Sequence, residues 1–112
     1  MFQVIPLLKQ YFNLGGFMSV ARITTLNLKS KEGADEIVQS YTATAPSKFP
    51  EAEQLLQIRV DDTTIIAISL YENSEAMERA TAARTQSLDS NKDNFASVDM
   101  KVGTVELNHS KV

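Results

Sequence analysis

The chain of 112 residues contains no cysteine and no tryptophan, and its single histidine is His109. The absence of cysteine excludes disulfides, thiolate-bound zinc, iron–sulfur clusters and thiol nucleophiles, and it fits a reducing, cytoplasmic compartment. A zinc site or a catalytic triad built on His109 would need partners that its position near the carboxyl end does not offer. We therefore expect neither a metal nor a cofactor.

The sequence also lacks clustered charge and long apolar runs. It has 11 Lys and Arg against 14 Asp and Glu, a net charge of -3, and no basic patch. Affinity for nucleic acid comes largely from clustered cations. The longest apolar stretches are a handful of residues, whereas about 20 are needed to cross a membrane. The expected partners therefore include neither nucleic acid nor a membrane.

Length and composition predict one globular domain, because 43% of the residues are apolar and 22% are charged. Residues 1–17 lack a periodic pattern, and Pro6 and Lys9 interrupt their apolar run, which argues against a secretory signal. This extension is either a short amphipathic helix that docks on the body or on a partner, or sequence upstream of a true start at Met18, the interpretation we prefer. The domain is then residues 18–112.

The first half of this domain predicts a strand and a helix. Residues 19–28 are rich in β-branched side chains and lack Gly and Pro, as is typical of a strand. Ser30 is a suitable N-cap, and acidic residues follow it. Apolar residues then recur with helical spacing up to Ala45, and the helix is expected to end at Pro46, with residues 47–50 as a loop.

The second half predicts a hairpin, a helix and a last strand. Strands at 54–60 and 63–71 are separated by Asp61-Asp62, which suits a two-residue turn that pairs Val60 with Thr63. A helix capped by Asn73 or Ser74 carries a stripe of small residues. The last strand is expected at 100–107, where Gly103 indicates a bulge or a close backbone approach.

The resulting order of strand, helix, two strands, helix and strand predicts an α+β, ferredoxin-like fold with both helices on one face of a four-stranded antiparallel sheet. The strand at 63–71 is apolar on both sides, so the second face of the sheet would also be apolar. Such a face favours a homodimer in which two sheets close into a barrel around a chamber. In the predicted register that face carries Ile23, Leu56, Ile58, Val60, Ile65 and Ala67.

The run from Ile65 to Met77, an apolar strand that ends in the aromatic–Glu pair Tyr71-Glu72 before a capped helix, resembles the antibiotic biosynthesis monooxygenase-like family. The link at residues 29–33 and the closing Gly103-Thr104-Val105 are also similar to that family. The resemblance covers about residues 19–109 and implies a homodimeric α/β barrel. Some members oxidise polycyclic phenols with dioxygen and no prosthetic group, whereas others degrade haem or bind small molecules.

Haem degradation is disfavoured, because the histidine of those members would fall near Ala80 and the chain has no tryptophan. Four residues are candidates for binding a small apolar or aromatic ligand inside the barrel: Thr25, Asn27, Ser69 and Tyr71. Each also has a structural alternative, since Tyr71 could fill the barrel end, Ser69 could make room, and the other two could make strand-edge hydrogen bonds.

Other charged residues have simpler explanations. Arg59 is expected to form a surface ion pair with Glu53 or Asp62 rather than to bind an anion. The sequence offers no obvious titratable base for the chamber, so the catalytic residues stay open. Three functions remain: a cofactor-independent oxygenase or related enzyme, a non-catalytic binding dimer, and a structural or interaction module.

Overall fold

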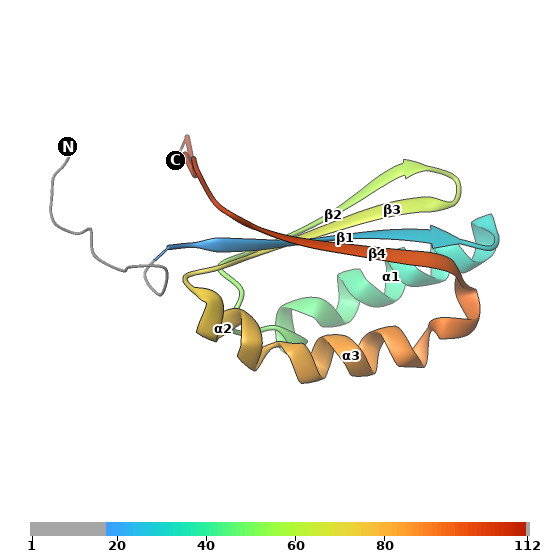
Figure 1. Cartoon of the computed structure of the whole chain (residues 1–112). Helices are drawn as coiled ribbons and strands as arrows, with labels where there is room; N and C mark the ends of the chain where they lie inside the picture. Colours follow the sequence, from blue (N-terminus) through green and yellow to red (C-terminus); the bar gives the residue numbers. More distant parts are fainter. Residues whose placement is uncertain (1–17, 112) are drawn as a thin grey trace, which may run out of the picture.

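The computed structural model describes residues 18–111, so the expectations for residues 1–17 lie outside the described residues. Its four-stranded antiparallel sheet has the order β2-β3-β1-β4. The strands are β1 (Val20–Leu28), β2 (Gln54–Asp61), β3 (Thr64–Tyr71) and β4 (Phe95–Thr104). The helices are α1 (Lys31–Lys48), α2 (Ser74–Arg79) and α3 (Thr81–Ser90), and all three lie on the same side of the sheet (Figure 1). This confirms the ferredoxin-like fold.

Helix α1 begins as predicted and ends later than predicted. The Gly33 N–H donates to the Ser30 Oγ at 2.9 Å, so Ser30 is the N-cap. The helix does not end at Pro46, because a proline in the last turn removes only one hydrogen bond, and the Phe49 N–H still donates to the Ala45 carbonyl at 2.9 Å. The expected loop residues Ser47 and Lys48 are therefore helical.

The hairpin between β2 and β3 corrects the predicted register by one residue. The Thr63 N–H donates to the Asp61 Oδ1 at 3.0 Å, and Asp61 still pairs with Thr64, so the turn residues are Asp62 and Thr63. A bulge between Arg59 and Asp61 takes up the extra residue. Side chains alternate between the two faces of a strand. The shift by one residue therefore moves each side chain of β3 to the opposite face of the sheet from the one predicted for it.

The region after β3 also differs from expectation. Asn73 caps α2, with the Ala76 N–H donating to its Oδ1 at 2.8 Å, and the expected single helix divides at Ala80 into α2 and α3. Strand β4 starts at Phe95, five residues before the predicted position 100, because Phe95 already pairs with Leu28. Gly103 makes no close approach, since a Cβ there would meet nothing within 4 Å. The bulge of this strand pair lies instead at Asn27 and Leu28.

The core lies between the sheet and the helices as two apolar clusters. One surrounds Tyr71 and Phe49, and the other surrounds Leu26 and Ile65. Between them, β1 and β3 carry buried polar side chains on the same helix-covered face: Arg22, Thr24 and Ser69. A polar region therefore interrupts the core at the middle of the sheet.

The other side of the sheet, called the open face below, carries no helix of residues 18–111 (Figure 1). Ile23, Leu56 and Ile58 lie there with 39%, 41% and 43% of their surfaces exposed. The prediction of an apolar open face is confirmed for these three. It is wrong for Ile65 and Ala67, which the corrected register places on the helix-covered face, with Ile66 and Ile68 on the open face instead. Val60 is exposed and unpaired in the bulge.

None of the helices between residues 18 and 111 is long and apolar enough to cross a membrane.

Candidate functional site

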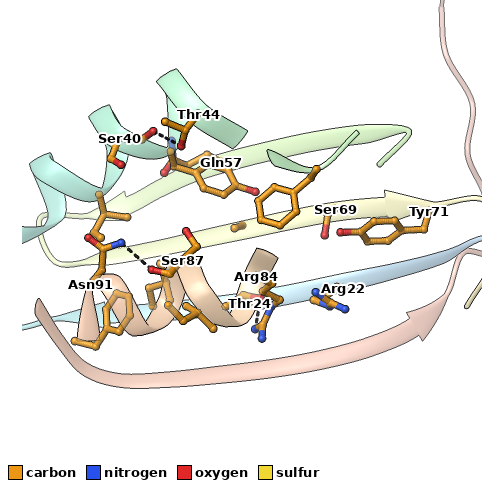
Figure 2. A pocket seen from close by; sticks show the side chains of 17 residues that line it. Arg22, Thr24, Ser40, Thr44, Gln57, Ser69, Tyr71, Arg84, Ser87 and Asn91 are labelled. Carbon is orange, nitrogen blue, oxygen red and sulfur yellow. Dashed lines mark hydrogen bonds between the residues drawn. The ribbon is translucent and has the colours of Figure 1, made fainter. Parts of the chain in front are cut away.

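A pocket lies between the sheet and the helices, at the polar interruption of the core (Figure 2). Its volume is about 80 Å³, several times the ~15 Å³ that a water molecule needs. Its walls come from all four strands, from α1 and α3, and from Phe49 after the end of α1. The pocket is therefore lined by residues of one subunit and has room for several water molecules or for part of a small organic molecule.

The four residues predicted to bind a ligand do not lie together. Ser69 and Tyr71 line this pocket, whereas Thr25 and Asn27 lie on the open face. There the Asn27 Nδ2 donates to the Ser97 Oγ at 3.0 Å, which is the strand-to-strand hydrogen bonding considered as the alternative. The prediction of one shared cavity is wrong because Tyr71 and Ser69 point to the helix-covered face, opposite to Thr25 and Asn27.

Arg22 is the most unusual residue of the pocket, because its charged side chain enters the core from the first half of β1. It is only 5% exposed, and its Nη2 donates to the Met77 carbonyl at 3.3 Å and to the Thr81 Oγ1 at 3.2 Å. The guanidinium carbon lies 5.8 Å from the centre of the Tyr71 ring, a cation–π distance. Its Nε is buried without a hydrogen-bond partner among the described residues.

A second arginine, Arg84, reaches the same pocket from α3. Its Nη2 donates to the Thr24 Oγ1 at 3.0 Å, a bond that Figure 2 shows beside Arg22. Burial lowers the pKa of the Arg84 guanidinium, and the nearby charge of Arg22 lowers it further. The two cations are thus close enough to repel each other in a partly dehydrated site.

No carboxylate among the described residues balances these two charges. The pocket lining contains no Asp or Glu, and the ion pairs within residues 18–111 join Asp35 to Lys31 and Arg59, and Asp99 to Lys101. The Asp35 pair also corrects the expected partner of Arg59, which reaches Asp61 and Asp62 only through their backbone carbonyls. The pocket therefore has a positive potential at the Arg22 and Arg84 end.

The rest of the wall combines neutral hydroxyl groups with apolar surface. Burial raises the pKa of the Tyr41 phenol above its ordinary value of 10.0, so this side chain is neutral at pH 7. In Figure 2 the hydroxyl end of Tyr71 points toward Ser69. The remaining lining residues are Leu26, Ile37, Ser40, Thr44, Phe49, Gln57, Ala67, Ser87, Leu88, Asn91 and Phe95. Such a wall can bind an apolar ring and donate hydrogen bonds to its polar substituents.

The described part of the chain offers little for metal or acid–base chemistry. No group of three or more His, Asp or Glu in residues 18–111 could hold a metal ion. His109 is exposed beyond the end of β4. The chemistry available to the pocket is binding, orientation, hydrogen-bond donation and stabilisation of negative charge.

Sequence reasoning missed both arginines. A signal for Arg22 was present, because it lies on the same face of β1 as Leu26 and Leu28, the face that was expected to pack on helices. A charged residue in such a position is rarely buried without a partner. Arg84 lies beside the stripe of small residues on the second predicted helix, and this position in the sequence does not indicate that its side chain is buried.

No protein-family model matches the chain, and its sequence matches no curated protein. Similar solved structures exist. A dimeric ferredoxin-like protein from an uncultured marine organism is 9% identical, with a TM-score of 0.69, and the match covers 85% of this chain and 94% of that one. The monooxygenase ActVA-Orf6 of Streptomyces coelicolor, solved with the ligand nanaomycin D, is 11% identical over 85% of this chain and 94% of that one, with a TM-score of 0.67.

The cofactor-independent oxygenase SnoaB of Streptomyces nogalater, in the form of a point mutant, is 16% identical over 80% of this chain and 95% of that one, with a TM-score of 0.60. Further similar structures include candidate antibiotic biosynthesis monooxygenases and a protein of unknown function. At these identities the likeness concerns the fold. The chain has the ferredoxin-like fold that antibiotic biosynthesis monooxygenase-like proteins also have.

Proposed function

We propose that this protein is a homodimer that binds a small electron-rich aromatic molecule in each subunit and oxidises it with dioxygen without a cofactor. The observation that carries the proposal is the pocket between sheet and helices, apolar along part of its wall and positively charged at the Arg22 and Arg84 end. It occurs in a fold shared with monooxygenases, one of which was solved with a ligand.

The pocket suits a reaction in which the substrate itself supplies the electrons. A phenol such as 1-naphthol reacts with one dioxygen to give 1,4-naphthoquinone and one water, so the ring loses four electrons and no external reductant is consumed. Positive potential from the two guanidinium groups lowers the pKa of the phenol and favours its electron-rich anion. The hydroxyl groups of Tyr71 and Ser69 can hydrogen-bond to the developing charge, while the apolar walls exclude water.

Dimerisation would cover the open face. Ile23, Leu56 and Ile58 each expose about two fifths of their surface in the single subunit. Contiguous apolar surface of this kind is typical of interaction sites, and a second copy of the chain around a two-fold axis is its simplest partner. The dimeric ferredoxin-like protein of similar fold supports this choice.

The oxygenase proposal can be tested with an oxygen electrode. Metal-free protein mixed with 1-naphthol is expected to consume dioxygen and to form naphthoquinone in a one-to-one ratio, above the rate without protein. The Tyr71→Phe variant should be slower, and the surface variant Ala43→Asp should match the wild type, because Ala43 is exposed on α1. Absence of protein-dependent oxygen uptake with any of a panel of phenols would contradict the catalytic part.

One observation favours the alternative of a non-catalytic binding protein. The pocket wall contains no histidine or carboxylate among the described residues that could act as a base. The same experiment separates the two functions, since a binding protein would take up 1-naphthol in calorimetry and leave the dissolved oxygen unchanged.

A further inference from the structure

We propose that the Arg22 and Arg84 end of the pocket is a subsite for a carboxylate, so that the natural ligand is a small aromatic acid. This inference rests on the proposed function only in that the pocket receives a small aromatic molecule. It adds a requirement to the proposed function, namely that the ligand carries a carboxylate. A phenol can be oxidised without such a permanently charged group.

The first argument is the charge that the fold buries without a counter-ion. Arginine is almost never fully buried unless it is paired, yet Arg22 is 95% buried and no carboxylate of the described residues lies within ion-pair distance of it. Arg84 adds a second cation to the same wall. Bringing two like charges together in a partly dehydrated site is unfavourable, and a bound anion would offset that cost.

The second argument is the supply of unused hydrogen-bond donors. The bonds to Met77 and Thr81 both involve the Nη2 of Arg22, which leaves its Nε buried and unpaired. The only hydrogen bond that the Arg84 side chain makes with the described residues is the one from its Nη2 to the Thr24 Oγ1. Guanidinium groups present their donors in a planar fork that matches the two oxygens of a carboxylate, whereas a phenolate offers a single oxygen.

The third argument concerns the rest of the ligand. The pocket continues from the arginines to apolar side chains that include Leu26, Leu88 and Phe95. An inorganic anion would satisfy the arginines and leave that apolar surface without a partner. A ring attached to the carboxylate would reach these apolar side chains from the arginines.

The test compares two probes of nearly equal shape, p-hydroxybenzoate and p-hydroxybenzamide, by isothermal titration calorimetry at pH 7 on the full chain. Only the first carries a negative charge. Wild-type protein is expected to bind the acid roughly tenfold or more tightly than the amide, because hydrogen bonds to charged groups are stronger than neutral ones. Arg84→Gln should remove this preference, and Arg84→Lys, which keeps the charge and loses the fork, should restore part of it.

Arg79→Gln is the matched control, because Arg79 is exposed at the end of α2 and does not line the pocket. It should keep the full preference for the acid. If circular dichroism shows that Arg22→Gln is folded, this variant should lose the preference for the acid as Arg84→Gln does. If Arg22→Gln does not fold, the result with Arg84→Gln decides the test.

The outcomes separate this inference from the proposed function. Equal affinity for acid and amide in the wild type would overturn the carboxylate subsite and leave an aromatic-binding pocket in place. Binding of inorganic phosphate as tightly as p-hydroxybenzoate would also overturn it, since the ring would then contribute nothing. Failure of both aromatic probes and of 1-naphthol to bind at millimolar concentration would overturn the pocket proposal as well.

Discussion

The two faces of the sheet differ in what they leave without a partner. The helix-covered face packs two apolar clusters and, between them, buried hydroxyl groups beside Arg22 and Arg84, whereas the open face carries partly exposed apolar side chains on β1, β2 and β3. Burial of unpaired charge and exposure of apolar surface are both unfavourable for an isolated chain. This comparison underlies the two proposals made above, a small-molecule ligand on one side of the sheet and a second copy of the chain on the other.

The largest expected effect separates the two faces at neighbouring positions of β3. Ile65 is fully buried under the helices, and Ile66 points to the open face. Ile65→Ala should lower the free energy of unfolding by about 2–5 kcal/mol, because it leaves a cavity in the core. Ile66→Ala should cost less, and its cost should grow with protein concentration if the open face is a dimer interface. Urea unfolding at two concentrations measures both, and equal costs at all concentrations would contradict the comparison.

The next effect concerns association. Ile58→Asp places a charge among the apolar residues of the open face, where Ile58 pairs with Ile66, and is expected to weaken the dimer at least roughly a hundredfold, because a charge would be buried without a partner. Sedimentation velocity at micromolar concentration should show a dimer for the wild type and for Ala43→Asp, and a monomer for Ile58→Asp. A monomeric wild type would exclude the proposed dimer.

A smaller effect distinguishes the predicted ligand-binding residues on the two faces. Tyr71→Phe keeps the ring beside Arg22 and removes one hydroxyl, so affinity for 1-naphthol should fall roughly fivefold, as expected for one hydrogen bond. Asn27→Ala on the open face should leave that affinity unchanged, because the Asn27 side chain bonds to Ser97 and lies across the sheet from the pocket. Calorimetry on both variants is the measurement. A loss of affinity on Asn27→Ala would restore a site on the open face.

The smallest expected effect is a dependence on alkaline pH that belongs to the helix-covered face. Burial raises the pKa of Tyr41 above 10.0, so the folded chain holds the phenol proton more tightly than the unfolded chain. The corresponding stability is complete below pH 10 and is lost as the pH rises through the raised pKa. Tyr41→Phe should therefore reduce the fall in urea midpoint between about pH 9 and pH 11. An identical fall in the variant and the wild type would mean that Tyr41 ionises equally in both states.

The elements were predictable because their signals are local. Ser30 and Asn73 cap helices through their own side chains, and β-branched runs favour strands. The end of α1 was not predictable from Pro46, since the penalty of a proline is small where few hydrogen bonds follow it. The hairpin register depended on a hydrogen bond that the Asp61 carboxylate accepts from the Thr63 N–H and on a bulge, neither of which the composition of the turn reveals.

The sequence by itself determined the order of the elements, the ferredoxin-like fold and the presence of apolar surface on both sides of β3, because periodicity and capping act over a few residues. Only the tertiary structure decided that Tyr71 and Ser69 share a pocket with Arg22 and Arg84 while Asn27 does not. Arg22 and Arg84 are 62 positions apart in the chain and meet only when α3 packs across β1. Long-range packing and strand register together decide which face each side chain occupies, and a shift of one residue moves a side chain from the pocket to the opposite face.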